Sequence, residues 1–168
     1  AIRAGGHYIL DEHGNLLPEY RDILKLVADR NVILSFGHIS RQEQKVTAEA
    51  CQQLGITKGF IDHPFSPFIA LTIEEMKEFA AAGVYINFTY DELSPLLGTN
   101  PLEFVEAMRQ VGPEHCLLSS DAGEPLFPDS VECMRLLRAY AEAFGLSSEQ
   151  AFQMSTSTPA KLLDLKLN

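Results

Sequence analysis

The stretch VILSFGH at residues 32–38 decides the fold class, because an apolar run of strand length ends there in a polar residue. Directly after it, Ser40 and Glu43 have the spacing of a capping box, which predicts a helix that runs to about Leu54 and stops at Gly55. A strand that is apolar on both faces and is followed at once by a helix is typical of a parallel sheet covered by helices. The run therefore predicts an α/β protein.

The same alternation of strand and helix returns further along the chain. We predict further strands over 59–63, 84–89 and 116–121. We predict further helices over 19–30, 72–83, 100–112 and 129–144, and two short ones after Ser147 and Thr158. Crossovers between parallel strands are right-handed, so we expect one α/β domain over residues 1–168.

Composition and charge exclude several other classes of protein. The chain has 168 residues, of which 46% are hydrophobic, and its formal net charge of −10 disfavours binding to nucleic acid or anionic membranes. No apolar run approaches the ~18 residues that a membrane span needs. Three cysteines without C-x-x-C spacing, and no secretory leader, favour a reducing compartment. We therefore expect a cytoplasmic protein that acts on a small molecule, and self-association stays open.

Metal-ligating residue types stand at three of the four predicted strand ends, namely His38, His63 and Asp121. Because the carboxyl ends of parallel strands lie along one edge of a sheet, these residues can share one ion. Two imidazoles and a carboxylate suit Zn²⁺, with Mn, Fe and Ni as alternatives, and leave a position for water. Such an ion lowers the pKa of its water toward ~7, and a carboxylate beside it takes the proton. Taken singly, each histidine also fits a hydrogen-bonded loop residue, and the aspartate fits a turn or helix cap.

The motifs FGH (36–38), IDHP (61–64) and LSSDAG (118–123), followed by STPAKLL (157–163), resemble in their order the amidohydrolase superfamily of metal-dependent hydrolases. The resemblance implies a (β/α)₈ TIM barrel in which His38 and His63 end strands five and six and bind metal. Asp121 would end strand eight, bind metal and act as the catalytic proton shuttle. The H-x-H pair that ends strand one in that family is absent here. We therefore expect strands five to eight, the C-terminal half of a barrel, in a protein whose N-terminal strands lie outside this sequence.

The resemblance further implies a hydrolase that acts on an amide, ester, lactone or related bond. Two alternatives stay open: a doubly wound, flavodoxin-like binding domain, for which 168 residues suffice, and a barrel that has lost catalysis. The chain contains no glycine-rich phosphate-binding motif. The loop PFSPF at 64–68 offers either an apolar wall for a substrate or ordinary packing, and His7 is either structural or part of a pocket.

Overall fold

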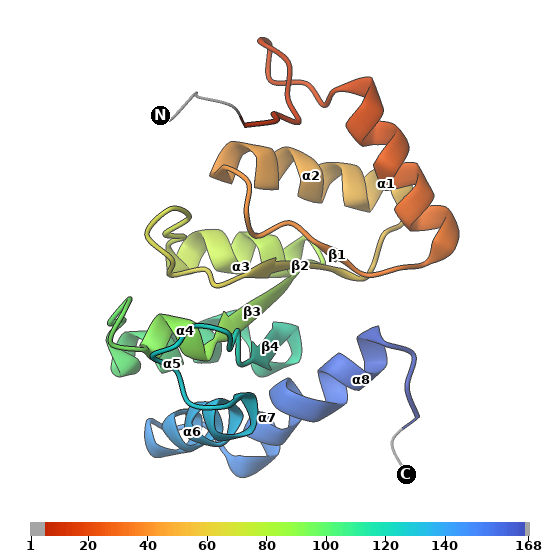
Figure 1. The fold of residues 1–168 in the computed structure, drawn as a ribbon. Coiled ribbons are helices and arrows are strands. Elements are labelled where there is room, and N and C mark those ends of the chain that lie inside the picture. Colours follow the sequence, from red (N-terminus) through yellow and green to blue (C-terminus); the bar gives the residue numbers. More distant parts are fainter. Residues whose placement is uncertain (1–5, 167–168) are drawn as a thin grey trace.

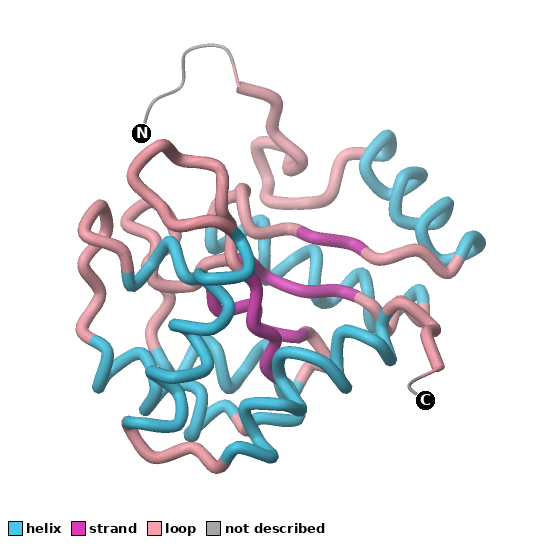
Figure 2. The backbone as a smooth tube through the Cα atoms, turned by 60° about the horizontal axis from the view of Figure 1, so that its bottom comes forward, coloured by secondary structure: helices cyan, strands magenta, loops and turns pink. Residues whose placement is uncertain are grey.

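The computed structural model describes residues 6–166, and the parts of the predicted domain at 1–5 and 167–168 lie outside the described residues. In Figure 2 the strands lie in the middle of the molecule, with helices and loops around them. The strands are β1 (Leu34–Ser35), β2 (Gly59–Asp62), β3 (Tyr85–Thr89) and β4 (Cys116–Ser119). All neighbouring pairs are parallel, and the order across the sheet is β1-β2-β3-β4. The prediction of an α/β fold with parallel strands alternating with helices is confirmed.

Most helices begin and end close to the predicted signals. The larger helices are α1 (Pro18–Arg30), α2 (Arg41–Leu54), α3 (Ile73–Ala81), α5 (Pro101–Val111) and α6 (Ser130–Ala143). The shorter elements are α4 (Tyr90–Leu93), the 3₁₀ segment η1 (Pro113–His115), α7 (Ser148–Phe152), the π-helical segment η2 (Gln153–Ser157) and α8 (Thr158–Leu162). The capping boxes at the starts of α2 and α3 have both of their hydrogen bonds.

The sequential strand order separates this sheet from a doubly wound one. In a doubly wound sheet the strand order reverses at a switch point, and ligands bind there. The described residues contain no such reversal, so the flavodoxin-like arrangement is not the one they form. Right-handed crossovers in a sequential order place the connecting helices on the same face of the sheet. In Figure 1, α1 and α2 lie beyond β1, whereas α6, α7 and α8 lie beyond β4.

The two faces of the sheet differ in chemistry. Ile61, Ile86 and Cys116 lie in register on three neighbouring strands, are fully buried, and belong to the main hydrophobic core. On the other face, Asp62 lies opposite Asn87. The helix-covered face therefore stabilises the fold, while the other face carries polar groups to the ends of the strands.

The first strand is much shorter than predicted. Only Leu34 and Ser35 are assigned to β1, although the backbone N–H of Phe36 still donates to the carbonyl of Phe60, at 3.1 Å. The chain turns at Gly37, and His38 therefore lies in a turn after the strand. Within residues 6–166, no helix has the length and apolar character needed to cross a membrane.

Candidate functional site

The structure brings His38 and His63 together at the carboxyl edge of the sheet. Their Nε2 atoms are 2.9 Å apart, and their rings meet edge to face with centroids 4.6 Å apart. His63 is buried, whereas His38 is exposed. Among the described residues, Nδ1 of His63 has no hydrogen-bond partner. The pair therefore lies at the protein surface, with His63 on the buried side and His38 on the solvent side.

A close backbone contact sets the position of the two histidines. A Cβ atom at position 37 would lie 2.8 Å from both the Cβ and the backbone nitrogen of Asp62, so a glycine is needed there. Gly37 directly precedes His38, and Asp62 directly precedes His63. The N–H of His63 donates to the carbonyl of Asn87 at 2.9 Å, and its φ of +37° turns the chain away from β2. The contact between residues 37 and 62 therefore lets the two rings meet.

A row of four polar side chains, which we call the polar ladder, crosses the sheet just before the histidines. It consists of Ser35, Asp62, Asn87 and Ser119, one from each strand. The hydroxyl of Ser35 and Nδ2 of Asn87 both donate to the carboxylate of Asp62, the latter at 2.7 Å. Nδ2 of Asn87 also donates to Oγ of Ser119, at 2.9 Å. The polar ladder joins the ends of all four strands and fixes the residue that precedes His63.

Asp121 lies two residues beyond β4 and is exposed, with a φ of +48°. It is close enough to Asp91 to influence that side chain: burial first, and then the negative charges of Asp121 and Glu124, raise the pKa of Asp91. The charge of His63 lowers the pKa of the same Asp91 carboxyl group. Carboxylates and the histidine pair thus occupy the same edge of the sheet, although Asp121 is not in contact with the pair.

The loop that follows His63 separates its two phenylalanines. Phe65 packs against the core, with its ring centroid 5.8 Å from that of Phe104. Phe68 is 63% exposed, and its ring stacks on His38 and meets His63 edge to face, each at a centroid distance of 5.4 Å. Of the two phenylalanines left open by the sequence, Phe68 is therefore the one beside the candidate site.

Glu92 is the buried group that sequence reasoning missed. Its carboxyl oxygens accept the backbone N–H groups of Phe65, at 2.6 Å, and of Thr89, at 2.9 Å. The side chain is fully buried, and this burial raises its pKa to about 8. Thr89 and Glu92 have the T-x-x-E spacing of a capping box, and this was the available signal. Glu92 ties the loop after β2 to the end of β3.

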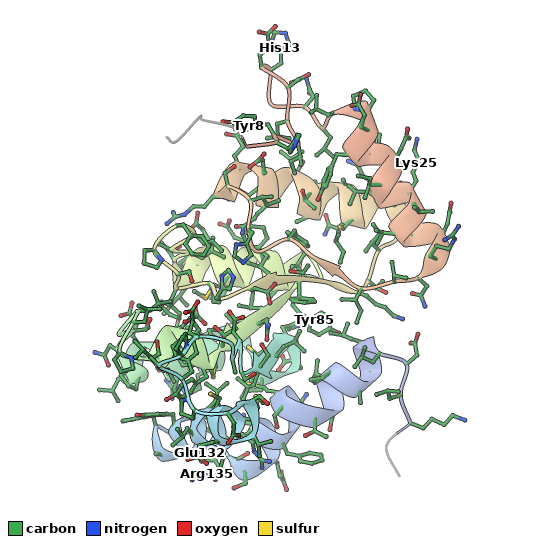
Figure 3. All side chains as sticks on the ribbon, viewed as in Figure 1. Tyr8, His13, Lys25, Tyr85, Glu132 and Arg135 are labelled. Atoms are coloured by element: carbon green, nitrogen blue, oxygen red, sulfur yellow. The ribbon has the colours of Figure 1, made fainter. Side chains whose placement is uncertain are left out.

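The remaining histidines lie elsewhere. His7 is exposed, and so is His13, which Figure 3 shows at the tip of the N-terminal excursion. His115 belongs to η1, directly before β4, and thus lies at the amino end of that strand. These positions leave His38 and His63 as the histidines at the carboxyl edge.

The nitrogen separation of the histidine pair is that of a hydrogen bond, and it is also compatible with two ligands that meet at one metal ion at a right angle. Nitrogens about 2.0–2.1 Å from an ion are about 2.9 Å apart at a right angle and about 3.3 Å apart at the tetrahedral angle. The observed 2.9 Å lies at the lower end of this span. Within the described residues, no three His, Cys, Asp or Glu side chains are grouped to hold a metal. The structure therefore brings two imidazole nitrogens together, with carboxylates at the same edge of the sheet.

The fold and these contacts define an α/β protein with a histidine pair at the carboxyl edge of a parallel sheet. The chain belongs to a family described as a family of unknown function (DUF6282), whose sequence model matches residues 2–87. The match includes β1, β2 and both histidines, but it ends before Asp121. A comparison with curated proteins finds no match.

Proposed function

We propose that the protein is a metal-dependent hydrolase of the amidohydrolase type that acts on an amide, ester, lactone or related bond of a small molecule. The observation that carries the proposal is the 2.9 Å separation of the Nε2 atoms of His38 and His63. These atoms meet at the carboxyl edge of a parallel sheet, where ligands of such sheets bind. Zn²⁺ would be the metal, with Mn, Fe and Ni as alternatives. A divalent ion bound there supplies an activated water at neutral pH.

Each residue has its own task in this proposal. His38 and His63 would hold the ion through Nε2, and Asp121 would complete the ligand set and take the proton of the attacking water. Asp121 would pass that proton to the leaving group. The polar ladder and Gly37 would hold the two imidazoles at a fixed separation, because both act on the residues next to the histidines.

The sheet order supports the further proposal that β1 to β4 correspond to strands five to eight of a (β/α)₈ barrel. Consecutive strands of such a barrel are parallel, neighbouring and joined by helices, as they are here. In this correspondence β3 is strand seven, which ends in Thr89 and provides no metal ligand. We also propose a cytoplasmic location, because Cys51, Cys116 and Cys133 are all buried free thiols.

Elemental analysis of protein purified without chelators and then dialysed against Zn²⁺ tests the proposal. We expect about one equivalent of metal in the wild type and its loss in the double variant His38→Ala/His63→Ala. His13→Ala is the matched control, since it removes an exposed imidazole away from the sheet, and it should keep the metal. Circular dichroism of all three proteins shows whether each is folded.

Two outcomes would contradict the proposal. The first is a folded wild type that holds no metal after exposure to Zn²⁺, because the pair is then a hydrogen-bonded structural feature. The second is equal metal content in the wild type and in the double variant, because the ion then binds elsewhere. In either case a barrel without catalysis becomes the better description.

A further inference from the structure

Phe68 is one of several large apolar side chains exposed at the surface, and its ring lies against both histidines of the pair. Phe68 is 63% exposed, yet its ring stacks on His38 at a centroid distance of 5.4 Å and an interplanar angle of 24°. It therefore stands beside the atoms proposed to bind metal, with much of its surface uncovered.

The loop that carries Phe68 is held at both ends. At its start, a carboxyl oxygen of Glu92 accepts the N–H of Phe65 at 2.6 Å. At its end, Nε of Arg41 donates to the carbonyl of Ile69 at 2.7 Å, and the same guanidinium also donates to the carbonyl of Ala70.

Hydrogen bonds within the loop also stabilise it. The backbone N–H of Ser66 donates to the carbonyl of His63 at 3.0 Å, and the N–H of Ala70 donates to the carbonyl of Ser66 at 2.7 Å. Ile69 is 2% exposed, so the residue after Phe68 is anchored in the core. Phe68 is therefore a fixed ring on a rigid loop, rather than a side chain at a mobile tip.

We propose that Phe68 is a specificity-determining residue, whose ring forms an apolar wall beside the histidine pair and selects substrates that carry a flat, uncharged apolar group next to the bond that is cleaved. This inference rests on the proposed hydrolase function and adds the substrate class. Aromatic rings that stack or meet edge to face gain affinity beyond their buried area, typically two- to tenfold per pair. The carboxylates of Asp91, Asp121 and Glu124 occupy the same edge of the sheet and disfavour an anionic group there.

Two hydroxamates that differ by one ring test the proposal. Benzohydroxamate and acetohydroxamate share a metal-binding group, and only benzohydroxamate offers a ring to Phe68. We expect the zinc-loaded wild type to bind benzohydroxamate about three- to tenfold more tightly in calorimetric titrations. Phe68→Ala should abolish this preference, so that the zinc-loaded variant binds the two hydroxamates with equal affinity. Phe152→Ala is the matched control, because Phe152 is 47% exposed on α7, and it should keep the preference.

A second measurement needs no metal. In the metal-free protein, the ring of Phe68 shifts the NMR signals of the ring protons of His38 and His63, and Phe68→Ala should move both signals. Phe152→Ala should move neither. Unmoved signals in Phe68→Ala would show that the ring does not lie beside the pair, and this overturns the inference without any test of the hydrolase.

The remaining outcomes separate the two proposals. Two results overturn the role of Phe68 and leave the proposed hydrolase untouched. One is equal affinity of the wild type for both hydroxamates. The other is a loss of affinity in Phe68→Ala that is the same for both hydroxamates. A wild type that binds neither zinc nor hydroxamate overturns the hydrolase, and the substrate class with it.

Discussion

Glu92→Gln should change how the stability of this protein depends on pH. Glu92 is fully buried, and burial raises its pKa to about 8 from the ordinary value of 4.5. Between these two values the folded state keeps a proton that the unfolded state has lost. The free energy of unfolding of the wild type therefore falls as pH rises from about 4.5 to about 8. Each pKa unit corresponds to about 1.4 kcal/mol, so the contribution of Glu92 falls by up to about 5 kcal/mol over this window.

Glutamine at position 92 has no charge to bury, so the variant should lack this decline. It should lose at most about 1–3 kcal/mol at pH 5, because one backbone N–H then faces an amide NH₂ group. As pH rises to 8, the wild type should lose stability relative to the variant. Urea denaturation followed by circular dichroism at pH 5, 6, 7 and 8 measures the difference between the two proteins.

The difference between the proteins is the informative quantity, since other carboxyl groups titrate equally in both. Glu149→Gln, at an exposed position on α7, is the control and should give a difference from the wild type that is independent of pH. The reasoning is refuted if the difference between wild type and Glu92→Gln is also constant from pH 5 to pH 8. Glu92 would then hold the loop with the same charge throughout this range.

Three further predictions follow from contacts in and around the site. Gly37→Ala should lower the free energy of unfolding by about 1–3 kcal/mol in urea denaturation, because its Cβ would lie 2.8 Å from the backbone nitrogen of Asp62. Gly123→Ala, with no atom within 4 Å of the new Cβ, should change it by less than about 0.5 kcal/mol, and equal losses would contradict the contact. Asn87→Ala removes both of its donors from the polar ladder and should cost about 1–3 kcal/mol in the same assay, whereas an unchanged midpoint would show that water replaces them. The three buried cysteines should react with a thiol reagent only after unfolding, since burial also raises the pKa of Cys116, and rapid labelling of the native protein would disprove their burial.

Local sequence signals predicted the helices well. The capping boxes at Ser40 and Thr72, and the Asn100–Pro101 pair, mark the starts of α2, α3 and α5, because these signals act within a single turn of helix. Apolar runs predicted the strands but not their ends. The run 32–38 contains only a two-residue strand, because the chain turns at Gly37 and backbone pairing, rather than hydrophobicity, determines how far β1 extends.

The sequence predicted only part of the site, because contacts between strands depend on how the strands pair. That His38 and His63 lie close together follows from their places at neighbouring strand ends, and their Nε2 atoms are 2.9 Å apart, whereas Asp121 is not in contact with them. The hydrogen bonds of Asp62 with Ser35 and Asn87 depend on strand register, which a single sequence does not contain. Glu92 has the sequence context of a capping glutamate, and its burial depends on tertiary contacts, among them that of the loop after β2, whose Phe65 N–H donates to it.

The backbone at two of the proposed site residues implies a trade-off between stability and function. His63 and Asp121 have φ values of +37° and +48°, in the left-handed region, which glycine occupies freely and which residues with a Cβ atom occupy at a cost. Each such residue costs roughly 1 kcal/mol relative to glycine. Selection of a mutant library for thermostability alone should therefore enrich glycine at both positions. The stabilised proteins that result would have lost a proposed metal ligand or the proposed proton shuttle, so a stability screen of this fold needs a metal-binding screen beside it.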